Sequence, residues 1–313
     1  MKPEIVVMRK LVPDVTMQRL AETYRMHAYW TADDVGGFLA SAQAARGLVT
    51  TGTIGADATL IEALPNLEII SCFGVGVDAI DLDAASARGI IVTVTTDVLT
   101  DAVADMGLAL WLSVLRRISE ADRFVRAGRW PKEVFPSGLS ARGKIAGIVG
   151  LGRIGRGVAD RMAAFGAEIA YTDLAARPDA PYRFVPDLVS LATEADFLLV
   201  CAAGGAGTAK LIDADVLEAL GPQGILVNIA RGSIVDQAAL IAALEAGRLG
   251  GAGLDVFADE PNVPEALLTR DDVVLAPHQA SNTIETRVAM GANVLANLAA
   301  HFAGEPVPTP FLG

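Results

Sequence analysis

Short apolar runs alternate with amphipathic stretches along most of the chain. The apolar runs are rich in Val, Ile and Leu and are expected to form strands at residues 5–8, 47–51, 67–72, 90–94, 144–149, 168–171, 197–200, 225–228, 253–255 and 273–275. Between them, apolar positions recur at helical spacing over residues 14–23, 56–64, 158–165, 213–220 and 237–246. Nearly continuous apolar strands separated by helices are typical of parallel sheets that helices cover on both faces. The pattern therefore predicts an α/β protein with parallel sheets.

The alternation is interrupted once, and this divides the chain into blocks. Residues 1–97 hold one strand–helix series, and residues 100–126 form one long helical stretch without a strand. The series restarts at Lys144 and continues to about residue 277, and a last helix is expected from Glu285 to about Ala303. Because no strand follows that helix, we expect it to cross back and complete the first domain. Two lobes with a ligand cleft between them are the predicted arrangement.

The composition supports a packed core and argues against a nucleic-acid partner. Of the 313 residues, 52% are hydrophobic and 20% are charged, which excludes intrinsic disorder. With 5% aromatic residues and 31 glycines, the composition favours close helix–sheet packing over a β-sandwich. The net charge is −12, and the longest basic cluster is Arg116-Arg117, so the chain lacks the basic surface that nucleic acid requires.

Neither a membrane segment nor a disulfide pattern is visible in the sequence. No apolar stretch approaches the roughly 20 residues of a membrane helix, and residues 1–8 lack the apolar core and cleavage site of a signal peptide. Cys72 and Cys201 lie far apart in apolar runs and are expected to be buried and unpaired. No clustered pattern of metal-binding side chains is present. We therefore expect a cytoplasmic protein without a membrane contact or a metal.

A glycine-rich motif follows the strand predicted at residues 144–149. Gly150-Leu151-Gly152-Arg153-Ile154-Gly155 stands between that strand and a helical run. In such a G-x-G-x-x-G pattern, Gly150 permits a tight turn, Gly152 lets the backbone approach a pyrophosphate, and Gly155 allows close contact between helix and strand. Phosphates bind the free N–H groups at the N-terminus of the helix. The motif predicts a dinucleotide site, although a structural turn or an S-adenosylmethionine site uses the same pattern.

Asp173 ends the next predicted strand and bears on the choice of cofactor. An acid at this position accepts hydrogen bonds from the ribose hydroxyls and repels a 2′-phosphate, which favours NAD(H). Arg177 lies four residues further on and is able to turn toward a phosphate, so NADP(H) stays an alternative. A helix cap or a turn would also suit Asp173.

Three polar residues follow three predicted strands in the second half of the chain. Arg231 comes after the strand at 225–228, Glu260 lies in the loop after 253–255, and His278 follows 273–275. Because the carboxyl ends of parallel strands meet at one edge of a sheet, we expect these side chains on the same edge as the glycine-rich turn. Taken singly, Arg231 suits a structural ion pair, Glu260 a solvated loop and His278 the end of a strand.

Together the three side chains suit the reduction of a ketone. A carbonyl that accepts a hydride develops alkoxide charge, and His278 is suited to supply the proton near pH 7. A carboxylate beside it, for which Glu260 is the candidate, stabilises the imidazolium. Arg231 is suited to hold a substrate carboxylate with its planar fork. The remaining histidines, His27 and His301, are expected to be structural.

With these motifs, the chain resembles the D-isomer-specific 2-hydroxyacid dehydrogenase family, and within it the glyoxylate/hydroxypyruvate reductase and hydroxyphenylpyruvate reductase branch. The order and spacing of Arg231, Glu260 and His278 match the family's catalytic arrangement. The resemblance runs from about residue 67 to the C-terminus. It implies two doubly wound parallel-sheet domains, a Rossmann dinucleotide-binding domain at residues 98–283 and a flavodoxin-like, substrate-binding lid at residues 1–97 and 284–313.

The resemblance also implies roles that the residues alone did not indicate. In the lid, the backbone N–H groups of Val75 and Gly76 receive the substrate carboxylate. The cofactor-binding residues implied are Gly150, Gly152, Arg153, Ile154, Gly155, Asp173, Cys201, Thr208, Ala230, Asp255 and Ala280. A homodimer built around the long helix at 100–126 is implied as well. Trp130, which follows that helix, is a dimer contact, part of a neighbour's cleft or an ordinary packing residue.

The chain departs from the family pattern in several places. Val94-Thr95-Thr96-Asp97 stands where many relatives carry Asn-Thr-Pro-Gly before the long helix. Ala202-Ala203-Gly204-Gly205 replaces a Pro-Leu-Thr run. Several NADP-preferring members of the branch carry arginine just after the second strand of the nucleotide domain, where this chain has Asp173-Leu174-Ala175. The usual cofactor of the branch therefore does not transfer to this chain.

These observations predict an oxidoreductase that converts a small 2-keto acid into the D-2-hydroxy acid with a nicotinamide cofactor, NAD(H) being favoured. Glyoxylate, hydroxypyruvate and aryl-pyruvates all fit as substrates. The alternative from another class is a binding protein that senses NADH and in which catalysis is vestigial. Turnover of a 2-keto acid separates the two.

Overall fold

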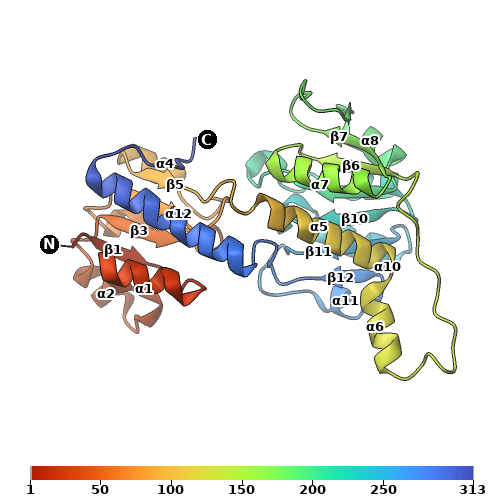
Figure 1. Cartoon of the computed structure of the whole chain (residues 1–313), viewed down its shortest axis with the longest axis horizontal. Helices are drawn as coiled ribbons and strands as arrows, with labels where there is room; N and C mark the ends of the chain where they lie inside the picture. The colour runs from red at the N-terminus through yellow and green to blue at the C-terminus, as the bar shows by residue number, and fades with distance from the viewer. Residues whose placement is uncertain (1, 313) are drawn as a thin grey trace. The chain divides into compact units, whose positions relative to one another are not determined.

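The computed structural model describes residues 2–312, which divide between two compact units. Unit 1 is discontinuous in sequence, because it contains the chain up to Leu99 and again from Ser281 onwards. Unit 2 is the continuous stretch Thr100–Ala280. Each unit is a parallel sheet covered by helices, which confirms the α/β architecture predicted from the alternating pattern (Figure 1).

Unit 1 contains a five-stranded sheet in the order β2-β1-β3-β4-β5. Val6, Leu48 and Ile70 are paired in register on β1, β3 and β4, and all three are fully buried. In this order the first strand lies between the second and the third, which is a doubly wound arrangement. The strands are β1 (Glu4–Val7), β2 (Arg25–Ala28), β3 (Gly47–Thr50), β4 (Ile69–Cys72) and β5 (Ile91–Thr93).

Helices cover both faces of this sheet. One face shares its core with α2 (Val35–Ser41), α3 (Ala58–Ala63) and α4 (Leu82–Ala87), and a short 3₁₀ helix, η1 (Tyr29–Thr31), follows β2. The other face is covered by α1 (Asp14–Thr23) and α12 (Ile284–Ala303). These two helices cross so closely that a Cβ atom on Gly291 would lie 1.9 Å from Oγ1 of Thr16, so only glycine fits there.

Unit 2 contains a seven-stranded sheet in the order β12-β11-β10-β9-β6-β7-β8. Its first strand, β6, lies between β7 and β9, which again makes the sheet doubly wound. The strands are β6 (Ile145–Val149), β7 (Glu168–Thr172), β8 (Arg183–Phe184), β9 (Phe197–Val200), β10 (Ile225–Asn228), β11 (Gly251–Leu254) and β12 (Val273–Leu275).

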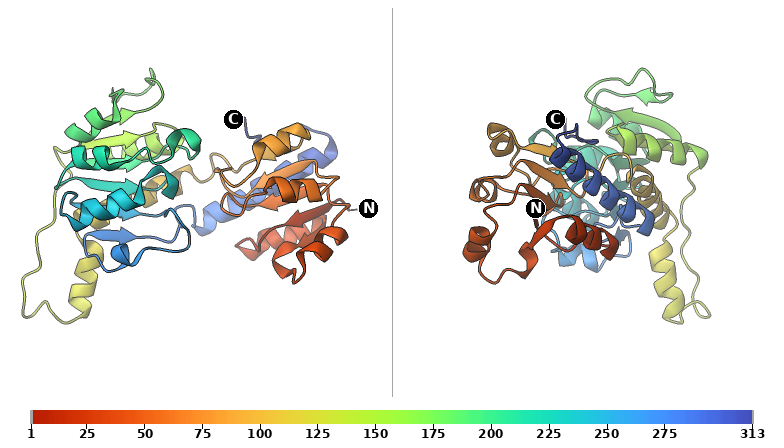
Figure 2. Two further views of the ribbon diagram at one scale, coloured as in Figure 1. Left: turned by 180° about the vertical axis from the view of Figure 1, so that it is seen from behind. Right: turned by 60° about the vertical axis from the view of Figure 1, so that its left-hand side comes forward.

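Figures 1 and 2 show helices on both faces of the unit 2 sheet. On one face lie α5 (Thr100–Leu115) and α7 (Arg153–Ala164), and the buried ring of Trp111 on α5 packs against Phe197 of β9 with ring centroids 5.4 Å apart. The other face shares its core with α8 (Leu188–Glu194), α9 (Ala214–Leu220), α10 (Gln237–Glu245) and α11 (Glu265–Leu268). The 3₁₀ helices η2 (Ala206–Thr208) and η3 (Gly232–Ile234) lie in loops.

The prediction of one long helix over residues 100–126 is wrong. The helix breaks after Leu115, where Arg117 adopts a left-handed conformation with φ of 54°, and α6 (Ile118–Arg126) begins beyond it. The physical reason is burial: α5 packs on the sheet through residues such as Trp111 and Leu115, whereas the apolar residues Ile118 and Val125 of α6 are exposed. The two-residue strand β8 is too short for periodicity to reveal and was not predicted.

None of the helices within residues 2–312 is long and apolar enough to cross a membrane. Neither Cys72 nor Cys201 forms a disulfide within the described residues. Over the same residues, no three His, Cys, Asp or Glu side chains gather in a way that could hold a metal ion.

Candidate active site

The glycine-rich turn connects β6 to α7 in the conformation that a dinucleotide requires. Gly150 has φ of +88°, and a Cβ atom there would lie 2.7 Å from Cα of Ala202. A Cβ atom on Gly155 would lie 2.1 Å from the carbonyl oxygen of Gly150, so the turn and the helix touch. Gly152 is the N-cap of α7 and has nothing within 4 Å of an added Cβ atom. The helix N-terminus therefore has room for a pyrophosphate, and the residues fit the predicted cofactor.

Asp173 follows β7 and faces this turn. Its Oδ2 accepts a hydrogen bond from the N–H of Leu151 at 3.1 Å and pairs with Nη2 of Arg177 at 2.9 Å. Only 11% of the Asp173 side chain is exposed, whereas 47% of the Arg177 side chain is. The acid is thus held at the second strand, as a ribose-binding acid is, and the arginine beside it partly neutralises its charge.

His278 and Glu260 form the central pair of the site. Nδ1 of His278 lies 2.6 Å from Oε2 of Glu260, and the side chains are 33% and 24% exposed. Oε1 of Glu260 accepts the N–H of Phe257 at 3.1 Å, which fixes the carboxylate from a second side. Because Nδ1 is engaged with Glu260, Nε2 is the ring atom left to meet a substrate. The sequence predicted these two residues as partners, and the structure brings them together.

Electrostatics keeps Glu260 ionised. Burial raises the pKa of its carboxyl group, but the hydrogen bonds from His278 and from the N–H of Phe257, together with the charges of His278 and Arg231, outweigh burial. The pKa of Glu260 therefore lies below its ordinary value of 4.5. A carboxylate that is charged near neutral pH holds the imidazole in one orientation and stabilises its protonated form.

Arg231 reaches the same edge of the sheet through the end of β10. Buried Asn228 fixes the turn, because its Oδ1 accepts the N–H of Ala230 at 3.0 Å and its Nδ2 donates to the carbonyl of Arg231 at 2.8 Å. Gly232 then meets the next loop, since a Cβ atom there would lie 2.0 Å from the carbonyl oxygen of Phe257. The loop that holds Arg231 and the loop that holds Glu260 are thereby packed against each other.

Asp255 organises the loop that contains His278. It is fully buried at the end of β11, and its two carboxylate oxygens accept the N–H groups of Gln279 at 2.8 Å and Ala280 at 2.9 Å. The N–H of His278 donates to the carbonyl oxygen of Asp255 at 2.8 Å. Burial raises the pKa of Asp255, against the two N–H groups, which lower it. From the sequence, Asp255 was predicted to bind the cofactor, and its positioning role was not predicted. The partners of Asp255 are backbone N–H groups, so no residue type in the loop indicates this role.

The remaining residues predicted to bind the cofactor also follow strands of unit 2. Cys201 follows β9, and burial raises the pKa of its thiol to about 12, which makes it unreactive. Thr208 lies in η2, where its hydroxyl donates to the carbonyl of Ala203 at 2.8 Å. Ala230 and Ala280 are buried. Their contacts with a cofactor stay predictions.

Val75 and Gly76 lie in unit 1, in the loop that follows β4. Within residues 2–312 their N–H groups donate no hydrogen bond. The loop is held in place, because the N–H of Thr95 donates to the carbonyl of Gly74 at 2.8 Å and a Cβ atom on Gly52 would lie 2.6 Å from the carbonyl oxygen of Gly76. Two adjacent N–H groups on a fixed loop suit an anion.

The other two histidines pair with glutamates in unit 1. Nε2 of His27 lies 2.8 Å from Glu4, and Nε2 of His301 lies 3.0 Å from Glu68. Both pairs connect elements of the unit 1 fold, as expected for structural histidines.

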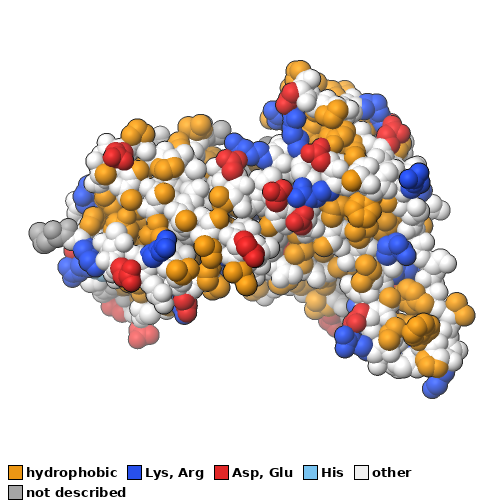
Figure 3. Space-filling view, viewed as in Figure 1, with side chains coloured by type: hydrophobic (Ala, Val, Ile, Leu, Met, Phe, Trp, Pro, Cys, Tyr) orange, Lys and Arg blue, Asp and Glu red, His pale blue; other side chains and the backbone are white. Residues whose placement is uncertain are grey.

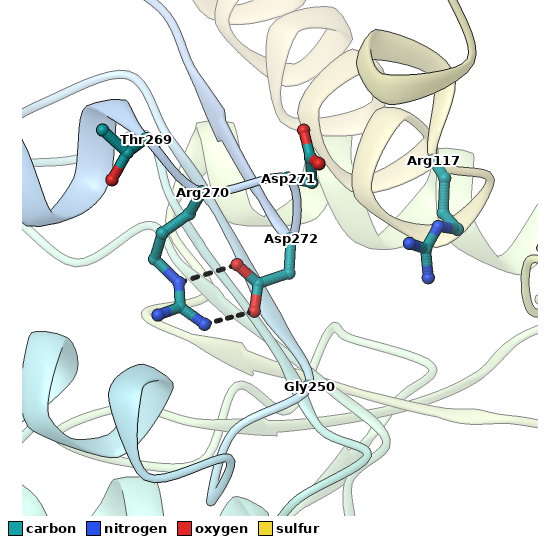
Figure 4. A pocket seen from close by; sticks show the side chains of 6 residues that line it. All are labelled: Arg117, Gly250, Thr269, Arg270, Asp271 and Asp272. Carbon is teal, nitrogen blue, oxygen red and sulfur yellow. Dashed lines mark hydrogen bonds and ion pairs between the residues drawn. The ribbon is translucent and has the colours of Figure 1, made fainter. Parts of the chain in front are cut away.

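An open pocket in unit 2 lies at the opposite edge of the sheet (Figure 4). Its residues Gly250, Asp271 and Asp272 precede β11 and β12, whereas Arg231 and His278 follow their strands. Figure 4 shows the guanidinium of Arg270 paired with the carboxylate of Asp272. The distances are 2.7 Å from Nε to Oδ1 and 2.6 Å from Nη2 to Oδ2. Because these charges satisfy each other, the pocket shows none of the convergent chemistry found at the other edge.

Comparisons with known proteins agree with this geometry. A family model described as "D-isomer specific 2-hydroxyacid dehydrogenase, NAD binding domain" matches residues 108–280, a stretch that contains the glycine-rich turn, Arg231, Glu260 and His278. The chain is 46% identical over 311 residues to a 2-ketogluconate reductase of Gluconobacter oxydans, with 99% of each chain covered. It is 47% identical over 294 residues to a hydroxyphenylpyruvate reductase of Plectranthus scutellarioides, with 94% of each covered.

A solved structure extends the similarity to the whole fold. It is the NADPH-dependent glyoxylate/hydroxypyruvate reductase of Sinorhizobium meliloti in complex with NADP and malonate. The two chains superpose with a TM-score of 0.94 at 43% identity, and the match covers 100% of this chain and 97% of the other.

Proposed function

Because the chain belongs to the D-isomer specific 2-hydroxyacid dehydrogenases, we propose that Arg231, Glu260 and His278 are the residues with which it converts a keto acid into a hydroxy acid. The protein is an NAD(P)-dependent enzyme that reduces small 2-keto acids. The observation that supports the catalytic assignment is the 2.6 Å contact between Nδ1 of His278 and Oε2 of Glu260. It provides a proton donor with a charged partner at the carboxyl edge of the nucleotide-binding sheet.

In the proposed mechanism, His278 donates the proton from Nε2 to the substrate oxygen that becomes the hydroxyl. Glu260 stabilises the imidazolium before the transfer and holds the ring in place. Arg231 binds the substrate carboxylate with its guanidinium. In unit 1, the N–H groups of Val75 and Gly76 are the proposed binding groups for a substrate carboxylate. When bound, the nicotinamide nucleotide supplies the hydride. Unit 1 is then the substrate-binding lid and unit 2 the dinucleotide-binding domain.

We propose that NAD(H) is the preferred cofactor. The pyrophosphate would lie over Gly152 and the first turn of α7. The carboxylate of Asp173 would accept hydrogen bonds from the hydroxyl groups of the adenosine ribose. A 2′-phosphate would meet the Asp173 carboxylate, although its pairing with Arg177 weakens this repulsion. NADP(H) therefore stays the alternative, and a direct comparison of the two cofactors decides.

The proposed partner is a second copy of this chain. We define the arm as residues 118–139, that is, α6 and the segment after it. Figure 3 shows hydrophobic side chains gathered around α6, and in the arm Val134 is 96% exposed and Trp130 69% exposed. Exposed apolar patches of this kind mark interfaces between proteins. A homodimer that covers the arm would bury them, and Trp130 would be a dimer contact. A cytoplasmic location stays a prediction from the sequence.

The experiment that tests the function is a reduction assay. Glyoxylate, hydroxypyruvate and hydroxyphenylpyruvate are each offered with NADH and with NADPH, and oxidation of the cofactor is followed at 340 nm. We expect turnover of at least one acid, formation of the D-hydroxy acid from hydroxypyruvate or hydroxyphenylpyruvate, whose products are chiral, and a higher kcat/KM for NADH. Binding of NADH without turnover of any 2-keto acid would instead identify a sensing protein and overturn the proposal.

A further inference from the structure

Arg287 carries a partly buried guanidinium, and among the described residues no acidic side chain forms an ion pair with it. It lies in the first turn of α12, and its Nε atom is buried and makes no hydrogen bond within residues 2–312. The ring of Phe73 lies 5.4 Å from its guanidinium carbon. A cation removed from water is costly unless an anion accompanies it, and a cation–π contact compensates for only part of that cost.

Arg9 brings a second positive charge to the same place. It lies two residues after β1 and is exposed. Burial lowers the pKa of Arg287 below its usual value, and the positive charge of Arg9 lowers it further. Two guanidinium groups that repel each other do not help unit 1 to fold. Arrangements of charge that oppose stability are characteristic of binding sites, where the ligand supplies the missing countercharge.

Arg287 lies beside the loop that we propose for the substrate carboxylate, and Arg9 lies at the same edge of the unit 1 sheet. Arg9 follows β1, and Phe73, which contacts Arg287, directly precedes the Gly74–Gly76 segment after β4. The carboxyl ends of these parallel strands form one edge of the unit 1 sheet. This edge therefore carries the N–H groups of Val75 and Gly76, with Arg287 beside them through Phe73, and Arg9 at the end of β1.

We propose that Arg287 and Arg9 bind a second anionic group, at the far end of a 2-keto acid whose first carboxylate is held by the Val75–Gly76 loop. This inference rests on the proposed function. The planar guanidinium of an arginine binds a carboxylate or a phosphate through two parallel hydrogen bonds. The Nη1 and Nη2 atoms of Arg287 are the proposed donors, because its Nε atom is buried. The substrate class is thus a 2-keto acid with a terminal carboxylate or phosphate.

Matched substrates test this inference. 2-Oxoglutarate and 2-oxopentanoate have the same five-carbon chain and differ in a terminal carboxylate against a methyl group, and phosphohydroxypyruvate and hydroxypyruvate differ in a phosphate. We expect a higher kcat/KM for the anionic member of at least one pair. The pair that shows the preference also tells whether the bound group is a carboxylate or a phosphate.

Variants connect the preference to the arginines. Arg287→Met should reduce the ratio of kcat/KM within the preferred pair about 10- to 100-fold, the usual loss for a hydrogen-bonded charge pair. Arg9→Met should reduce the same ratio by a smaller factor. Because the two charges repel each other, Arg287→Met should leave Tm unchanged or raise it. The matched control is Arg19→Met, an exposed arginine of α1, which should leave the ratio at its wild-type value.

The assays distinguish a failure of the anion site from a failure of the proposed function. If the enzyme reduces glyoxylate but shows no preference within either pair, or if the preference survives in both arginine variants, the anion site is wrong and the proposed function stands. If no 2-keto acid is reduced at all, both are wrong. Should Arg287→Met fail to fold, its burial is structural, and the exposed Arg9→Met variant still decides the preference.

Discussion

The carboxylate of Asp255 accepts a hydrogen bond from the backbone N–H of Ala280, with 2.9 Å between Oδ2 and N. Together with the bond to Gln279, this contact holds the loop after β12 against the end of β11. His278 lies in that loop with φ of +49°, a left-handed conformation that a residue other than glycine adopts only when its surroundings fix it. The buried aspartate therefore fixes the backbone from which the imidazole ring extends to Glu260.

Asp255→Asn tests this relationship. The amide that replaces the carboxylate offers one acceptor oxygen in place of two, so one N–H of the loop is left without a partner, and the loop loses its geometry. We expect kcat to fall by up to about 100-fold, because small displacements of a catalytic group are costly, with a smaller change in KM for NADH. The control is Asp215→Asn, which changes an exposed aspartate of α9. Wild-type kcat in the Asp255 variant would show that His278 is positioned by other contacts.

Removal of the proton donor should affect turnover much more than cofactor binding. His278→Asn is the suitable change, because asparagine tolerates the left-handed conformation at this position while lacking the imidazole. We expect kcat to decrease about 10²- to 10⁴-fold with an unchanged Kd for NADH, measured by steady-state kinetics and by fluorescence titration. His301→Asn, which changes a histidine of α12 paired with Glu68, is the control. Near-wild-type turnover in the His278 variant would rule out the proposed acid.

The pH profile should report the charge of Glu260. Because the pKa of Glu260 lies below 4.5, its charge is fully present at neutral pH and is lost only as the pH falls through that lowered value. Glu260→Gln removes the carboxylate that accompanies His278, so kcat of the variant should be lower than that of the wild type at neutral pH. The ratio of the two kcat values should approach one only at pH values below 4.5, where the wild type loses the same charge. A ratio that does not change with pH would show that the charge of Glu260 does not contribute to turnover.

The architecture and the central pair were predictable because both follow from local patterns. Apolar runs of strand length separated by helices specify parallel sheets, and parallel sheets bring the residues after each strand to one edge. For this reason the contact between Glu260 and His278 follows from their places in the chain.

Other features depend on tertiary contacts that the sequence does not encode locally. The break at Arg117 follows from where the buried face of α5 ends, and helical periodicity continues through it. The bonds of Asp255 go to backbone N–H groups, which any residue provides. Arg287 is unremarkable in the sequence of α12, and its lack of an acidic partner is visible only when Phe73 and Arg9 are seen around it.

The pair of Asp173 and Arg177 should control the choice between cofactors. In Asp173→Asn the repulsion of a 2′-phosphate disappears, and Arg177 is released from its 2.9 Å ion pair to bind that phosphate. We expect the ratio of kcat/KM for NADPH to that for NADH to rise about 10- to 100-fold, as for other charge-assisted hydrogen bonds. In the double variant with Arg177→Met the gain should be largely lost. A ratio that does not respond to Asp173→Asn would mean that other residues select the cofactor.

The arm should determine the oligomeric state. It is ordered by contacts of its own, because the guanidinium of Arg129 lies 4.7 Å from the ring of Phe124 and pairs with Glu133 at 2.6 Å. Val134 is nonetheless 96% exposed, which leaves an ordered apolar surface facing water. Such a surface is stabilised when a second copy covers it.

Val134→Glu places a charge on that surface at a side chain that is almost fully exposed in one chain. We expect the wild type to have twice the mass of one chain by light scattering, and the variant to dissociate at concentrations where the wild type does not. Leu174→Glu, at an equally exposed site after β7, is the matched control and should stay associated with the wild-type mass. A wild type that is monomeric at micromolar concentration would exclude the dimer. A Val134→Glu protein that keeps the wild-type mass would place the interface outside the arm.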